Sequence, residues 1–132
     1  MTTHAFRLNP GQDLKKEIEI YVRNKNILAG WISTCVGSLT TYNIRFANQP
    51  GGSKGSGHFE IISLTGTVSL NGSHLHIGIS DNNGKTLGGH LLEENIIYTT
   101  AEIVISELKD HVFTREYDET TSFNELQIIL RD

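Results

Sequence analysis

The chain has 132 residues, a length typical of one domain, and we expect a single domain over residues 1–132. With 37% hydrophobic and 20% charged residues, it is neither apolar enough for a membrane span nor polar enough to be disordered throughout. The formal net charge is −4 and no segment concentrates basic residues, so the composition argues against direct binding to DNA.

The amino-terminal segment MTTHAFRLNPGQDLKK has no apolar run behind basic residues, and no stretch of about 18 apolar residues occurs in the chain. We therefore expect a cytoplasmic protein with neither an export signal nor a membrane anchor. The lone cysteine, Cys35, has no partner for an internal disulfide. Its setting in WISTCVGS predicts a small buried side chain in a strand rather than a reactive thiol.

The first predicted elements are a strand and a helix. The strand covers His4 to Leu8 and ends at the breaker Asn9-Pro10-Gly11. The helix begins at Asp13 and ends near residues 24–26, because apolar side chains recur there at helical spacing. Those side chains are Leu14, Ile18, Tyr21 and Val22. We expect this one amphipathic helix to lie on a sheet.

After Gly30 the chain consists of short β-rich runs separated by turn signals, so antiparallel pairing and an α+β fold are expected. The segment NQPGGSKGSG, from Asn48 to Gly57, lacks the spacing of a phosphate-binding loop and is predicted to be a surface loop. The predicted strands are Trp31 to Val36, Ser38 to Ala47, Phe59 to Leu70, His74 to Ser80, Thr86 to Leu92, Ile96 to Ile105, Val112 to Tyr117 and Glu125 to Leu130.

Two turns set the register of the central hairpins. Asn71-Gly72 predicts a two-residue type I′ loop, which places Thr67 opposite His76. The segment DNNGK, residues 81–85, suits a three-residue loop with Gly84 in the left-handed region, and this loop places His76 opposite His90.

Side-chain alternation supports these faces, because a one-residue slip would expose every apolar residue. The predicted core face carries Ile62, Leu64, Val68, Leu75, Ile77, Ile79, Leu87 and Leu91. The predicted polar face carries Ser63, Thr65, Thr67, Ser69, His74, His76, Gly88 and His90.

Three histidines thus share one face. Opposed Cβ atoms lie about 5 Å apart, so His76 and His90, with His74 diagonal to His90, are close enough to bind one ion. Three protein ligands and one open position are typical of a catalytic zinc site. The alternative is that these are solvated histidines on the wet face of a sheet, and the sequence leaves that alternative open.

Glu60 and Glu102 are candidate accessory carboxylates, because each lies inside an otherwise apolar strand pattern. The alternation places Glu60 on the core face unless a bulge reverses it.

An ordered series of segments resembles the PPC domain family along nearly the whole chain. The segments are RLNPGQDL, ILAGWIST, VGSLTTYNIRFA, FEIISLTGTVS, HLHIGISDNNGKTLGGHL, TTAEIVI, FTREYD and ELQI. In plants this domain is fused to AT-hook motifs in nuclear proteins, whereas free-standing prokaryotic members often carry a DNA-binding label.

The resemblance implies a sheet of about seven strands with flanking helices, a homotrimer, and a metal site in some prokaryotic members. The fold is also similar to that of acetolactate decarboxylase, whose zinc is held by a His-x-His pair and a later histidine. The matching positions here are His74, His76 and His90. The likeness covers fold and ligand pattern only, so it does not transfer decarboxylation.

Three functions follow as hypotheses. The first is a trimeric module that binds a divalent metal, with zinc as the candidate, or a small ligand at the three histidines. The second is a metal-dependent enzyme acting on a small oxygenated substrate. The third is a DNA-associated regulatory protein, as the family label suggests, although the AT-hook core Arg-Gly-Arg-Pro is absent.

Overall fold

The computed structural model describes residues 1–132 and contains eight strands and one helix. In chain order these are β1 (Thr2–Leu8), α1 (Leu14–Asn24), β2 (Gly30–Arg45), β3 (Ser53–Ser69), β4 (Gly72–Ser80), β5 (Thr86–Leu91), β6 (Ile96–Glu107), β7 (His111–Asp118) and β8 (Phe123–Leu130). The expected α+β fold with a mostly antiparallel sheet is confirmed, with eight strands where about seven were expected.

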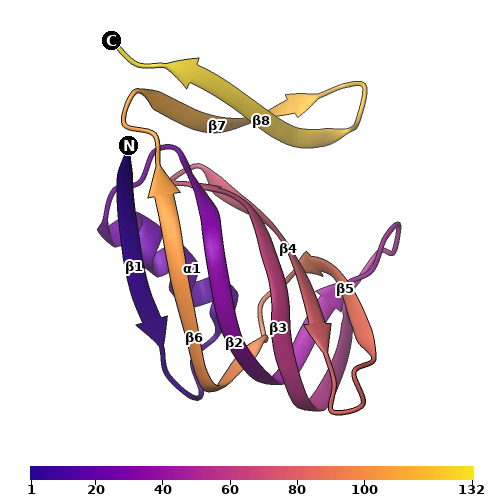
Figure 1. The fold of residues 1–132 in the computed structure, drawn as a ribbon. Helices are drawn as coiled ribbons and strands as arrows, with labels where there is room; N and C mark the ends of the chain where they lie inside the picture. Colours follow the sequence, from indigo (N-terminus) through magenta and orange to yellow (C-terminus); the bar gives the residue numbers. More distant parts are fainter.

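Six of the strands form one antiparallel sheet in the order β1-β6-β2-β3-β4-β5, and β7 and β8 form a separate hairpin (Figure 1). The sheet closes on itself, because the end of β2 also pairs with β5. In this closing pair Ile44 lies opposite Leu91, and Arg45 lies opposite His90. Strands β2 to β5 therefore enclose part of the core, and the closure fixes one arginine beside a site histidine.

Helix α1 covers the core as the sequence predicts. Its cap residue Asp13 accepts a hydrogen bond from the backbone N of Lys16 at 3.1 Å, which satisfies one of the free donors of the first turn. The buried stripe of the helix packs against the sheet and consists of Leu14, Ile18 and Val22. No helix in the structure has both the length and the apolar character needed to cross a bilayer.

Strand β2 is one continuous element, so the predicted separation into two strands at Gly37 is wrong. A Cβ atom at Gly37 would collide with the carbonyl oxygen of Thr100 on β6. The missing side chain therefore permits close approach of β6 rather than ending the strand. Three register shifts along the pairing with β6 bend β2, which lets it contact three neighbours.

The predicted surface loop from Asn48 to Gly57 is also too long. Strand β3 already begins at Ser53, which pairs with Ile44, and the hairpin with β2 continues through Gly55 opposite Tyr42. The Tyr42 ring lies against the bare backbone of Gly55, so the glycine-rich sequence still supports pairing.

At the β3–β4 turn the predicted register is wrong by two residues. Ser69 pairs with Gly72, which makes Leu70 and Asn71 the loop and places Thr65, not Thr67, opposite His76. Distant contacts explain the difference: the backbone N of Leu70 donates to the Ile27 carbonyl at 3.1 Å, outside the ladder. Because the shift is even, the side chains from Leu64 through His76 keep their predicted faces.

A bulge between Ile61 and Ser63 corrects the predicted core face. Ile61 is buried at 5% exposure, whereas Ile62, predicted to be in the core, is 56% exposed. The same bulge reverses the alternation at Glu60, whose side chain is exposed rather than on the core face.

Candidate metal centre

The β4–β5 turn sets the positions of the histidines. Asp81 Oδ1 accepts hydrogen bonds from the backbone N atoms of Asn83 and Lys85, both at 2.9 Å. Gly84 has φ 80°, the left-handed conformation that the sequence predicts. The resulting register pairs His76 with His90, as expected, and Gly78 with Gly88.

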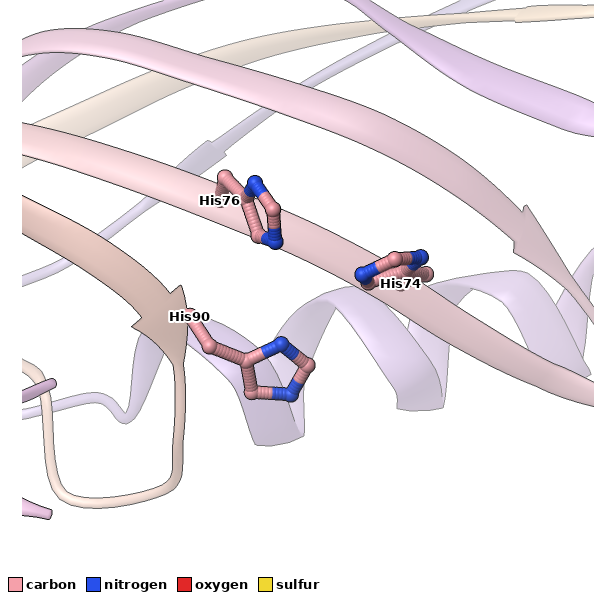
Figure 2. A group of neighbouring side chains, drawn as sticks. All are labelled: His74, His76 and His90. Carbon is pink, nitrogen blue, oxygen red and sulfur yellow. The ribbon is translucent and has the colours of Figure 1, made fainter. Parts of the chain in front are cut away.

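The three imidazoles converge in front of β4 and β5. Figure 2 shows His74 and His76 on one strand and His90 on the next, with the rings turned toward a common space. Ring centroids are 4.9 Å apart for His74 and His76, 5.5 Å for His74 and His90, and 5.8 Å for His76 and His90. One ring nitrogen from each lies within 4.8 Å of the other two. Small side-chain rotations would bring these nitrogens to the Zn–N distance of about 2.0–2.1 Å.

The surroundings of the cluster lower the pKa values of two of its imidazoles. Burial, and then the Arg45 guanidinium, lower the pKa of His90 to about 4. Burial, and then the neighbouring His76, lower the pKa of His74 as well. A neutral imidazole is the form that binds a metal, so these two groups are ready to do so at neutral pH.

His90 also carries an unsatisfied atom. Its Nδ1 is buried and has no hydrogen-bond partner in the protein. Leaving a buried polar atom unpaired is costly, and a bound ion at this nitrogen would remove that cost. The residues present therefore fit a divalent metal, both by donor type and by this unpaired nitrogen.

The candidate carboxylates lie outside the cluster. Glu60 is exposed on β3 and lines a different cavity together with His58 and Tyr98. Glu102 is exposed on β6, opposite Arg7 on one side and Val36 on the other. Neither belongs to the group whose ligand atoms converge.

Two arginines beside the histidines were not anticipated from the sequence. Arg45 ends β2 and lies opposite His90 across the closing strand pair. Arg115, on β7, donates a hydrogen bond of 2.9 Å to Thr67 Oγ1, and Thr67 lies opposite His74. Both contacts depend on long-range pairing, so no local pattern in the sequence signals them.

Comparisons with known proteins agree with the fold. The model of the Plants and Prokaryotes Conserved (PCC) domain matches residues 1–109. The chain therefore belongs to this family, which is the PPC family that its sequence resembles. The bifunctional protein GlmU of a Synechococcus strain is 42% identical over 125 residues, which cover 95% of this chain but 20% of that protein. The chain thus spans about a fifth of the length of this curated relative.

Solved structures show the same fold. A hypothetical protein from Salmonella enterica matches with a TM-score of 0.97 and 39% identity, over 99% of this chain and 95% of that one. A metal-containing protein from Archaeoglobus fulgidus matches with a TM-score of 0.77 and 24% identity, over 96% and 94% of the two chains. At that identity the second likeness concerns the fold alone.

Proposed function

We propose that this protein binds a divalent metal ion, zinc in particular, through His74, His76 and His90. The observation that carries the proposal is the convergence of the three imidazoles, one of which holds a buried nitrogen without a partner. Imidazole nitrogen is a preferred ligand of zinc and of neighbouring first-row metals. The metal-containing Archaeoglobus protein, which has the same fold, adds support.

We expect the metal-bound protein to be a small-ligand or regulatory module. A metal-dependent enzyme acting on a small oxygenated substrate is the second candidate, and the cavity beside the histidines favours it. When bound to three protein ligands, zinc supplies Lewis acidity at a remaining position. The roles of the chain are to hold the ion with neutral imidazoles and to shape the adjoining cavity with side chains of β7 and β8.

We further propose a homotrimer, which the family resemblance implies. The β7–β8 hairpin supports association with further copies, because it lies apart from the main sheet (Figure 1). It also carries many exposed apolar side chains. These are Tyr117, Phe123, Ile128, Ile129 and Leu130. A cluster of this kind is typical of a surface that a partner covers.

A cytoplasmic location completes the proposal. Cys35 is half-buried in β2, and burial raises the pKa of its thiol to about 12. The thiol therefore stays protonated and unreactive at neutral pH. A single reduced cysteine suits a reducing compartment.

Metal analysis tests the proposal. The protein, purified without a histidine tag and dialysed against zinc, is expected to hold about one zinc ion per chain by elemental analysis. EDTA should remove the ion and lower the thermal midpoint, because binding to the folded state stabilises it. Zinc, nickel, iron and manganese are each supplied in separate preparations. The proposal is wrong if none of them remains bound.

A further inference from the structure

Two arginines, Arg45 and Arg115, line the cavity beside His74 and His90. The volume of this cavity is about 490 Å³, large enough for a small organic molecule. The only carboxylate in its lining is Glu125, on β8. The lining therefore contains two guanidinium groups and one carboxylate. The cavity has an excess of positive charge, although the net charge of the chain is −4.

Both guanidinium groups have free donors. Arg45 donates one long hydrogen bond of 3.4 Å to the Gln49 carbonyl, and Arg115 donates one of 2.9 Å to Thr67 Oγ1. Each guanidinium has five N–H donors, so most remain without a protein partner. Neither arginine forms an ion pair with Glu125, although all three side chains line the same cavity.

The two arginines approach the cluster from different parts of the fold. Arg45 lies on the sheet as the cross-strand neighbour of His90, whereas Arg115 reaches the Thr67–His74 pair from the separate β7–β8 hairpin. An ion held by three neutral imidazoles keeps its full positive charge, so the site would have an excess of positive charge and call for an anion.

We propose that this cavity binds a small molecule bearing an oxoanion group, a carboxylate or a phosphate, which Arg45 and Arg115 hold beside the histidines. The planar fork of a guanidinium matches both groups with paired hydrogen bonds. The inference rests on the proposed metal site for the position of the anion. Dependence of anion binding on the two arginines nevertheless distinguishes this inference from the metal proposal.

Calorimetry with two simple probes tests the inference. Oxalate and inorganic phosphate are titrated separately into zinc-loaded and metal-free protein in a buffer without competing oxoanions. At least one probe should bind the zinc-loaded protein, and Arg45→Gln and Arg115→Gln should each weaken that binding by about tenfold or more. Stronger binding of oxalate indicates a carboxylate ligand, and stronger binding of phosphate indicates a phosphorylated one.

Arg7→Gln is the matched control, because Arg7 also donates to a threonine hydroxyl, that of Thr100, but lies on β1 away from the cavity. It should leave the affinity unchanged. Arg115→Lys keeps the charge but lacks the planar guanidinium, so this variant should bind the anion less tightly than the native protein. It replaces Arg115→Gln in the test if that variant fails to fold.

The outcomes separate this inference from the proposed metal site. Zinc binding without anion binding, or anion binding that is equal in the native protein and both arginine variants, overturns the inference and leaves the metal site standing. If no metal binds, the metal proposal fails. Anion binding to the metal-free protein that depends on both arginines would then still support the inference, and its absence would overturn it.

Discussion

At the residue scale, His76 is the histidine whose loss tests the site most cleanly. It is opposite His90 and two residues from His74, so His76→Ala leaves two ligands and zinc affinity should collapse. Its side chain is exposed, so removing it opens no core cavity. In EDTA we expect the free energy of unfolding to change by about 1 kcal/mol or less. Elemental analysis and thermal midpoints with and without EDTA measure both effects.

His58→Ala is the matched control, because His58 is also an exposed strand histidine but contacts Tyr98 rather than the cluster. It should retain the metal. If His76→Ala holds as much zinc as the native protein, the alternative that these are solvated surface histidines is supported instead. A loss of stability that persists with EDTA would instead indicate a structural role for His76.

The sequence predicts the histidines but not the arginines, and the reason is physical. His76 and His90 are joined by one short turn whose chemistry is local, so counting residues from Asp81 gives their pairing. Arg45 lies opposite His90 only because β2 pairs with β5, which closes the sheet. Arg115 contacts Thr67 from the separate β7–β8 hairpin. Pairings between distant segments leave no trace in local spacing.

At the scale of elements, Gly66 couples the β3–β4 ladder to the site. It lies opposite Leu75, between the pairs that carry His74 and His76, and has φ 144°. A Cβ atom there would collide with the carbonyl oxygen of His74. We expect Gly66→Ala to destabilise the protein by about 1–3 kcal/mol and to weaken zinc binding, because the backbone that carries His74 must move.

Denaturant unfolding and zinc titration of the variant measure these two effects. Gly51→Ala is the control, because a Cβ atom at Gly51 meets nothing within 4 Å. It should change stability by no more than about 0.5 kcal/mol. Native stability and native zinc affinity in Gly66→Ala would show that the ladder tolerates a side chain there and does not constrain the histidines.

The β3–β4 turn shows where element prediction from sequence reaches its limit. Asn71-Gly72 has the composition of a type I′ loop. In the structure, however, the backbone N of Leu70 donates a hydrogen bond to the Ile27 carbonyl, and the Asn71 side chain donates one of 3.0 Å to the Phe113 carbonyl. These tertiary hydrogen bonds outweigh the local turn preference. Side chains alternate between the two faces of a strand, so a register shift of two residues leaves them on the same faces. The face that carries the histidines is therefore predictable from the sequence, although the exact β3–β4 pairing is not.

At the scale of the whole molecule, the apolar β7–β8 hairpin and the family resemblance lead us to expect a homotrimer. Sedimentation equilibrium at micromolar concentration should give three times the chain mass of 14.7 kDa. Phe123→Ser with Ile128→Ser should shift the protein toward monomers, because both side chains are exposed apolar groups of this hairpin. A stable monomer of the native protein would contradict the expectation.

The charge of the molecule leads to a second expectation at this scale. Three chains at −4 each carry −12, so a trimer should have no appreciable affinity for duplex DNA at physiological salt. Fluorescence anisotropy with a random duplex at about 0.15 M salt measures it. Sub-micromolar binding that weakens as the salt concentration rises would contradict this expectation and support the DNA-binding function that the family label suggests.

The central claim is that one divalent ion lies between His74, His76 and His90, and anomalous diffraction tests it most directly. Crystals of the zinc-loaded, untagged protein are measured on both sides of the zinc absorption edge. We predict one anomalous peak per chain, about 2.0–2.1 Å from a nitrogen of each of the three imidazoles. No peak between these imidazoles, or a peak only at other side chains such as His58 or His4, would contradict the claim.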